Sequence, residues 1–203
     1  MKSARFAVCV HVYYLDVWSD IQESIGRFSE RVDVYITCRP EIEGEVRASL
    51  RGELQASTIL VIEDAGMDVL PFLKACRAER LDRYAAILKL HTKNRKSESG
   101  AYQGAMMLEA LCGSPKIVDS IMDVFDSDHD SGMVGAAFQV RSARALMYGN
   151  GALVEQILDV LAVRLNDWPF LVGTMFWISG RLLRPLVENL DRFVECGTEK
   201  DGA

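Results

Sequence analysis

The chain has 203 residues, of which 49% are hydrophobic and 26% charged, with a formal charge of −6. These values are typical of a globular domain with one substantial core, and the negative charge argues against a nucleic-acid partner. The sequence contains no apolar run of the roughly 20 residues that a membrane-spanning helix needs.

The first predicted element is an apolar strand over Arg5–Tyr14. This segment could be mistaken for a secretory signal, but His11, Tyr13 and Asp16 interrupt it and no small-residue cleavage site follows. We therefore interpret it as a buried strand and expect a cytoplasmic protein. Peripheral association with an assembly machinery at the inner face of the cell membrane would then require a partner.

Strands and helices alternate along the rest of the chain. Apolar runs predict further strands over Val32–Cys38, Thr58–Ile62, Tyr84–Leu90, Gly132–Phe138 and Phe170–Ile178. Helices are predicted over Val17–Ser29 (with Ser19 as N-cap), Pro40–Gln55, Val69–Leu81, Ala101–Leu111, Pro115–Phe125, Ala152–Leu165 and Arg181–Leu190. This alternation predicts an α/β fold, a Rossmann-like three-layer sandwich with a mostly parallel central sheet.

The five cysteines are far apart and form no CxxC pair or Cys/His cluster. A structural zinc site is therefore not expected, and we assign no metal ligands. The thiols are interpreted as small core side chains, at positions Cys9, Cys38, Cys76, Cys112 and Cys196.

Candidate binding residues follow the predicted strands, because ligands of α/β proteins bind beyond the carboxyl ends of the strands. His11 and Tyr13 end the first strand, and the acidic segment Glu63–Asp68 follows the third. Within that segment, Gly66 could adopt a positive φ or let a ligand approach the backbone closely. Asp68 precedes a predicted helix, so it is expected either to act as the N-cap alone or to cap and also contact a ligand.

The fourth strand ends in an unusual basic segment, Lys89-Leu90-His91-Thr92-Lys93. Alternation along a strand places Lys89, His91 and Lys93 on one side if the strand continues that far. Such a cluster could neutralise a diphosphate, or it could be a solvated strand end that leads into a basic loop.

Several of these segments resemble those of the rhamnan synthesis protein F family, which is linked to bacterial polysaccharide and lipopolysaccharide assembly. The matching segments occur in order along nearly the whole chain, and the His-Thr-Lys and Gly-Thr-Met-Phe-Trp segments are the most specific. They are His11–Tyr14 with Trp18, Asp64–Leu73, Leu88–Lys93, Gly132–Gly135, Gly149-Asn150 and Gly173–Trp177.

The resemblance implies a glycosyltransferase A-like domain over residues 1–203. Its expected donor is a nucleotide-sugar, with rhamnose or another deoxyhexose as the sugar, and its expected acceptor is a surface-polysaccharide glycan or a lipid-linked glycan. The family fold carries an acidic metal-binding motif where this chain has His91-Thr92-Lys93. We therefore expect Lys93, with Lys89, to offset the diphosphate charge, although a divalent cation (Mg²⁺ or Mn²⁺) remains an alternative.

The resemblance also implies roles for single residues. A carboxylate late in the chain acts as general base in this fold, and Asp201 occupies the matching position. The residues expected to bind the nucleotide-sugar are His11, Tyr13, Asp64, Gly66, Asp68, Lys89, His91, Thr92 and Lys93.

The chain departs from the family pattern at three arginines, two of them in the Glu63–Asp68 segment and one where Tyr102-Gln103 stands. Relatives also continue beyond the Asp201-Gly202 pair, so the domain is expected to be shortened at its C-terminus. These departures leave a second interpretation open: a catalytically impaired domain of the same fold that binds glycan or nucleotide within a polysaccharide assembly complex.

Overall fold

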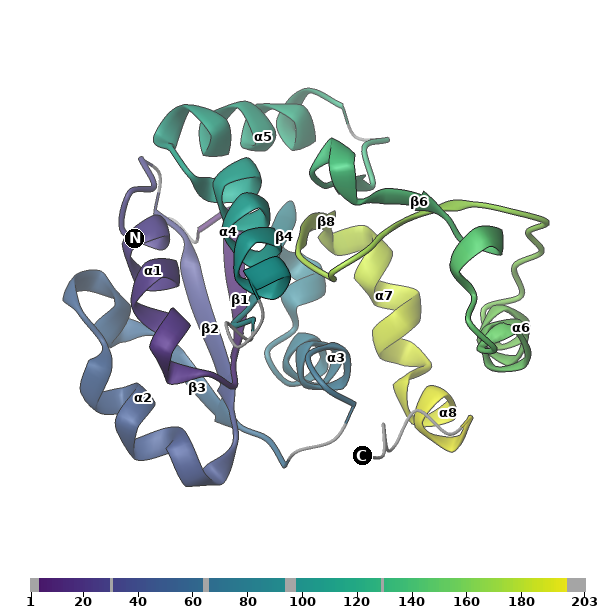
Figure 1. Cartoon of the computed structure of the whole chain (residues 1–203), viewed down its shortest axis with the longest axis horizontal. Coiled ribbons are helices and arrows are strands. Elements are labelled where there is room, and N and C mark those ends of the chain that lie inside the picture. The colour runs from purple at the N-terminus through teal and green to yellow at the C-terminus, as the bar shows by residue number, and fades with distance from the viewer. Residues whose placement is uncertain (1–3, 30, 64–65, 94–97, 129, 197–203) are drawn as a thin grey trace.

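The computed structural model describes residues 4–29, 31–63, 66–93, 98–128 and 130–196 (Figure 1). Within them, six strands form a central sheet in the order β3-β2-β1-β4-β8-β5. Four strands are parallel: β1 (Phe6–Val12), β2 (Asp33–Cys38), β3 (Thr58–Val61) and β4 (Ala86–His91). β8 (Phe176–Ser179) is antiparallel to both β4 and β5 (Met133–Val134). The predicted α/β fold with a mostly parallel sheet is confirmed, and it is compatible with a Rossmann-like fold.

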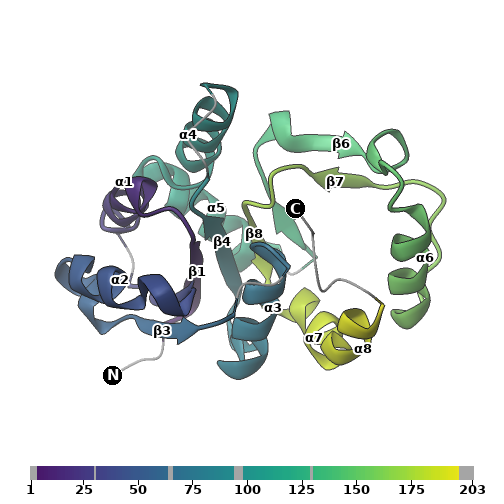
Figure 2. The ribbon, with the colours of Figure 1, turned by 60° about the horizontal axis from the view of Figure 1, so that its bottom comes forward.

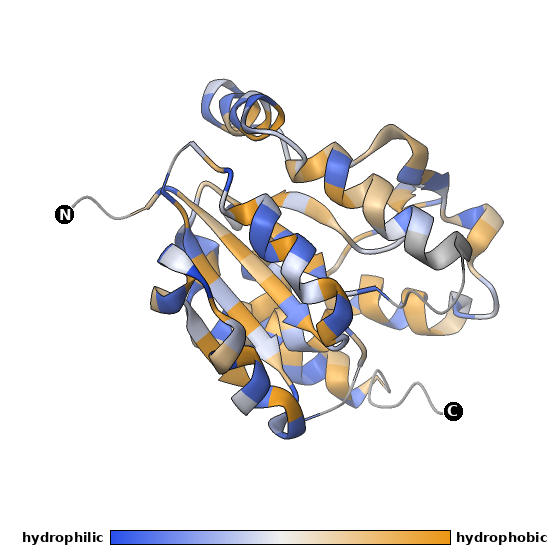
Figure 3. Ribbon diagram, turned by 60° about the vertical axis from the view of Figure 1, so that its left-hand side comes forward, coloured by the Kyte–Doolittle hydropathy of each residue, from blue (hydrophilic) through white to orange (hydrophobic). Residues whose placement is uncertain are grey.

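Helices cover both faces of the sheet, as continuous burial of β1 requires. Phe6, Val8 and Val10 of β1 face a core shared with α1 (Leu15–Ile25), α4 (Glu98–Cys112) and α5 (Pro115–Ser127). Ala7 and Cys9 face a second core shared with α3 (Val69–Ala78) and α7 (Gly180–Glu188). Apolar residues accordingly run along the strands and the inner sides of the helices in Figure 3.

The helix predicted over Ala152–Leu165 ends at Val160, and two other predicted helices differ further from those observed. The helix predicted over Pro40–Gln55 is wrong: a 3₁₀ turn over Pro40–Ile42 leads into α2 (Glu43–Ser49), and a second 3₁₀ turn covers Gly52–Ala56. Extended backbone at Leu50 (ψ 134°) and a positive φ of 55° at Gly52 separate the pieces. The first helix begins at Leu15, so its N-cap is Tyr14 and not Ser19.

The two strands predicted near the C-terminus are also corrected. Only Met133–Val134 of the Gly132–Phe138 run forms a strand. The Phe170–Ile178 run divides into β7 (Pro169–Leu171) and β8, because Gly173 and Thr174 between them have positive φ values of 85° and 51°.

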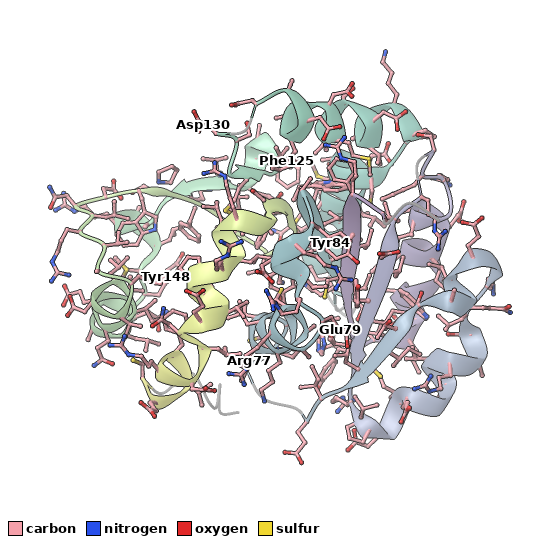
Figure 4. All side chains as sticks on the ribbon, turned by 180° about the vertical axis from the view of Figure 1, so that it is seen from behind. Arg77, Glu79, Tyr84, Phe125, Asp130 and Tyr148 are labelled. Carbon is pink, nitrogen blue, oxygen red and sulfur yellow. The ribbon has the colours of Figure 1, made fainter. Side chains whose placement is uncertain are left out.

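β7 pairs with β6 (Val140–Ser142) in a separate two-stranded ribbon. This ribbon and α6 (Gly151–Val160) lie on the opposite side of the molecule from α1 and α2, as Figures 1 and 2 show. α6 contacts α8 (Leu190–Glu195). An ion pair between Arg77 Nη1 and Asp191 Oδ1, at 2.7 Å, joins α8 to α3, and Figure 4 labels the Arg77 side chain on α3.

Four of the five cysteines are buried, as their interpretation as core side chains requires, and Cys196 is not. Cys9, Cys38, Cys76 and Cys112 are buried, Cys196 is half-buried, and all five are free thiols.

Gly180 provides a test of how closely α7 packs on the sheet. A Cβ atom there would lie 2.2 Å from the carbonyl oxygen of Tyr84 and 2.8 Å from that of Asp82. Backbone atoms cannot move aside cheaply, so Gly180→Ala should lower the free energy of unfolding by about 2–3 kcal/mol in urea titrations. Gly44→Ala in α2 is the matched control, because a Cβ there would meet no atom within 4 Å. Equal midpoints for the two variants would contradict this packing.

Candidate functional site

The candidate site lies at the edge of the sheet where β1, β2 and β4 end. These three strands are parallel neighbours in register, so His11 of β1 lies between Thr37 of β2 and His91 of β4. The three side chains belong to the odd-numbered face that packs against α3. The sequence-predicted residues His11 and His91 are therefore brought together at one end of the sheet.

A buried ion pair stands at the centre of this edge. Lys89 of β4 is 2% exposed, and its ammonium donates hydrogen bonds to the Asp68 carboxylate and, over 2.8 Å, to the Thr174 carbonyl oxygen. The Thr174 hydroxyl donates to the same Asp68 oxygen over 2.7 Å. The rings of Phe72 and Phe176 lie beside the ammonium, 5.6 and 5.8 Å from it. Lys89 thus joins three segments: β4, the start of α3, and the β7–β8 turn.

Local backbone geometry brings Asp68 to this position. Gly66 and Met67 both have positive φ values, 65° and 50°, and a Cβ on Gly66 would lie 2.5 Å from Leu70 Cβ. The positive φ predicted for Gly66 is therefore confirmed. Asp68 is the N-cap residue of α3, but its side chain makes no capping hydrogen bond. The expected capping role is wrong, because the carboxylate is directed to Lys89.

Opposing effects set the pKa values of this pair. Burial raises the pKa of Asp68, but the charges of Lys89 and His91 and the hydrogen bonds from Lys89 and Thr174 outweigh it and lower the pKa to about 2. Burial lowers the pKa of Lys89, and attraction to Asp68 opposes that change. Asp68 is therefore a carboxylate at every pH at which the protein would work.

His91 lies against the same carboxylate. Its Nδ1 atom is 3.5 Å from Asp68 Oδ2, is buried, and has no hydrogen-bond partner among the described residues. Burial lowers the pKa of His91 to about 4, Asp68 opposes the shift, and Lys89, Lys93 and His11 add to it. His91 is therefore neutral at pH 7, which removes it from the cations available to a phosphate.

Thr92 and His11 hold the strand ends together. The Thr92 hydroxyl accepts hydrogen bonds from the backbone N–H groups of Tyr13 and Tyr14, each over 2.8 Å, and the Thr92 N–H donates to the His11 carbonyl oxygen over 3.0 Å. The His11 ring is hydrogen-bonded to the Thr37 hydroxyl through Nδ1, over 2.9 Å. Thr92 thereby satisfies N–H groups at the start of α1 and fixes the path of the β1–α1 connection.

Strand alternation does not extend to Lys93, because β4 ends at His91. This lysine lies beside α4, where a Cβ on Gly104 would be 3.4 Å from the Lys93 Cβ. A pocket of about 200 Å³ opens here between α1 and α4. Its lining residues are Val17, Asp20, Ile21, Ser24, His91, Lys93, Gly104, Ala105, Leu108, Glu109 and Met175.

Two residues of this edge escaped the sequence analysis. Arg39 directly follows β2, and its guanidinium lies 4.2 Å from the centre of the Tyr13 ring. Thr174 completes the pair described above. A cation one position beyond a strand end was the available signal for Arg39, whereas Thr174 stood only within the Gly173–Trp177 motif.

Two sequence-predicted residues, Asp64 and Asp201, lie outside the described residues. Within the described ranges, no three His, Cys, Asp or Glu side chains gather in a way that could hold a metal ion. At the strand ends themselves, the Asp68 carboxylate already compensates Lys89, and Lys93 adds a further cation. The donor set that the described residues offer on this edge therefore does not fit Mg²⁺ or Mn²⁺.

Comparison with protein-family models gives a match to rhamnan synthesis protein F over residues 1–194. The chain belongs to the rhamnan synthesis protein F family. Its predicted resemblance is thereby confirmed, and the family description associates it with polysaccharide synthesis.

Two relatives, both named uncharacterized protein WxcX, come from two strains of Xanthomonas campestris pv. campestris. Each is 30% identical over 194 residues, which is 92% of this chain but only 27% of the relative. The chain therefore spans about a quarter of the length of these relatives. No solved structure gives a significant match, and no helix in the described part of the chain combines the length and apolar character needed to cross a membrane.

The Lys89–Asp68 pair makes a prediction about stability. Removing one partner of a buried ion pair leaves the other charge uncompensated, so Lys89→Met should lower the free energy of unfolding by about 3–5 kcal/mol. The double variant Lys89→Met/Asp68→Asn should recover most of this loss, and Lys93→Met at the rim should change little. Urea titrations measure all three. Additive losses in the double variant would contradict the pairing.

His91 makes a prediction about pH dependence. Its pKa of about 4 in the folded state lies below the ordinary 6.5, so the unfolded chain binds the proton more tightly between these values. The free energy of unfolding should then fall by roughly 3 kcal/mol as pH drops from 6.5 to 4. His91→Gln should remove this part of the pH dependence of the free energy of unfolding. The stability that ionised Asp68 contributes is lost only below about pH 4. Parallel profiles for the two proteins, from urea titrations across this range, would show that His91 is not buried in its neutral form.

Proposed function

We propose that this domain binds a nucleotide-sugar at the carboxyl edge of its sheet and transfers the sugar to a polysaccharide acceptor. One observation carries the proposal: two cations, Arg39 and Lys93, follow the strands on either side of β1, and Lys93 also lines a pocket. Strands lie about 4.8 Å apart, so both long side chains can reach one diphosphate placed above β1. Membership in a polysaccharide-synthesis family supports the same chemistry.

We assign the diphosphate to these two cations and not to Lys89. Lys89 is buried and compensated by Asp68, so its charge serves the fold. Arg39 offers the planar guanidinium that binds phosphate through paired hydrogen bonds, and Lys93 offers a point charge. Tyr13 lies under Arg39, which gives the nucleotide an aromatic surface to lie against.

The pocket between α1 and α4 suits the sugar. Its volume of about 200 Å³ is below the roughly 300–1,000 Å³ of sites that enclose drug-sized ligands, so it fits one ring and not a whole nucleotide-sugar. Carboxylates of Asp20 and Glu109 can accept hydrogen bonds from sugar hydroxyls, while Leu108 and Met175 supply apolar wall. An apolar wall also accommodates the methyl group of a deoxyhexose such as rhamnose.

Several further parts of the proposal start from the resemblance to the family. A glycosyltransferase A-like fold is supported by the mostly parallel sheet with its site at the carboxyl edge. The glycan or lipid-linked acceptor, the general base Asp201, the cytoplasmic location and any contact with membrane assembly machinery belong to the proposal in the same way. Diphosphate binding by Lys93 and Arg39 would need no divalent cation.

Nucleotide binding tests the proposal directly. Isothermal titration of the full-length protein with UDP-, dTDP- and GDP-sugars should find one that binds, and EDTA should leave its affinity unchanged. Lys93→Gln and Arg39→Gln should each weaken binding about tenfold or more, because each removes a charged hydrogen bond to phosphate. Lys116→Gln is the matched control, since Lys116 is exposed on α5.

Strict dependence on a divalent cation would contradict the assignment of the diphosphate to Arg39 and Lys93. Binding of nucleotide-sugar without any turnover, in the presence of acceptor glycan, would instead favour a domain that binds nucleotide or glycan without catalysis.

A further inference from the structure

We propose that His91 is the proton acceptor of the transfer reaction and that Asp68 holds it in the required tautomer. The inference rests on the proposed function and assigns to a described residue the role that the family resemblance gives to Asp201. It is carried by three features of the same cluster: the direction in which Nδ1 faces, the fixation of Asp68, and the position of His91 beside the pocket.

The tautomer of His91 follows from its neighbour. Nδ1 lies 3.5 Å from Asp68 Oδ2, and a carboxylate can only accept a hydrogen bond. Nδ1 therefore carries the proton of the neutral ring, and the lone pair lies on Nε2. Separations of this size are common before substrate binds and tighten in the reactive complex.

Asp68 can orient His91 because hydrogen bonds hold its carboxylate in place. One of its oxygens accepts from the Lys89 ammonium and from the Thr174 hydroxyl at 2.7 Å, and the Gly66–Met67 backbone sets the direction of approach. Lys89, itself 2% exposed, is held in turn by the Thr174 carbonyl oxygen. Asp68, Lys89 and Thr174 are thus positioning residues, and none of them needs to touch the substrate.

The charges around His91 keep it neutral and able to take a proton. Burial lowers its pKa to about 4; the Asp68 carboxylate opposes this, whereas the Lys89 and Lys93 ammonium groups and His11 reinforce it. A neutral imidazole offers no charge to a diphosphate. It can, however, accept a proton, with a basicity close to that of a carboxylate base. His91 is therefore better suited to the acceptor hydroxyl than to the donor phosphates.

The step balances with groups already named. The acceptor hydroxyl loses its proton to His91 Nε2 as its oxygen forms a bond to the anomeric carbon. The bond between that carbon and the diphosphate oxygen breaks, and the nucleoside diphosphate leaves with the electron pair. Arg39 and Lys93 offset the charge that develops on the leaving group. The proton passes from Nε2 to solvent when the product leaves.

The tautomer can be measured without any substrate. The sequence contains three histidines, so ¹⁵N NMR spectra of histidine-labelled protein can be assigned with His91→Gln. We expect the His91 signals of an Nδ1–H ring at pH 7. In the Lys89→Met/Asp68→Asn variant, which removes both charges together, the ring should lose this preference. A wild-type ring protonated on Nε2 would overturn the proposal.

Kinetics separate catalysis from binding. In assays with the nucleotide-sugar identified by titration, His91→Gln should lower kcat about 100-fold or more, which is the usual contribution of a general base. The Kd of the nucleotide-sugar should be unchanged. Asp201→Asn is the matched comparison. A kcat within threefold of wild type for His91→Gln, or a loss that appears only as weaker donor binding, would overturn the proposal. If the wild-type protein binds no nucleotide-sugar, the proposed function itself is refuted. Binding by the wild-type protein is therefore measured before any variant is made.

Discussion

A lysine buried inside a parallel strand imposes the main constraint on this edge of the molecule. Lys89 lies between apolar neighbours on β4, with its ammonium shielded from water. Removing such a charge from water costs several kcal/mol unless a counter-charge and hydrogen bonds are supplied. Asp68 and Thr174 supply them, so the start of α3 and the β7–β8 turn must both come to β4. The positive φ values at Gly66 and Thr174 are the backbone conformations that allow it.

That constraint divides the charges of the site into two layers. In the inner layer, Lys89 and Asp68 compensate each other and His91 is neutral, so it presents no net charge. In the outer layer, Arg39 and Lys93 remain at the strand ends. The inner layer could therefore orient the proposed proton acceptor, while the outer layer would bind the proposed diphosphate. The two lysines of the basic segment Lys89–Lys93 thus have different roles. Lys89 is buried and pairs with Asp68, and only Lys93 lies at the rim.

Local sequence patterns predicted the parts of the fold that depend on local burial. β1, β2, β3 and β4 appear within about two residues of their predicted ends, because strands buried on both faces are continuously apolar. The prediction was wrong for Pro40–Gln55, Gly132–Phe138 and Phe170–Ile178, where chain breaks or pairing with distant strands override the local preference. In the site, alternation placed Lys89 and His91 on one face. Their partners could not be found in this way, since Thr174 lies 85 residues from Lys89 and 106 from Asp68.

The arginines that this chain lacks relative to its family need not leave the site without phosphate ligands. Arg39 arises from a different strand end, yet its stacking on Tyr13 directs the guanidinium toward β1, the strand next to the Lys93 end of β4. Two cations around β1 match the two negative charges of a sugar-linked diphosphate, and the inner layer adds none. A third rim cation would leave excess positive charge once the diphosphate is bound. It would also hold the departing nucleoside diphosphate more tightly, because that product gains a negative charge when the sugar leaves. The carboxylates of Asp20 and Glu109 line the pocket that we propose for the sugar, whose hydroxyl groups need acceptors. Recognition of the diphosphate and of the sugar is thus assigned to opposite charges on adjoining parts of one edge.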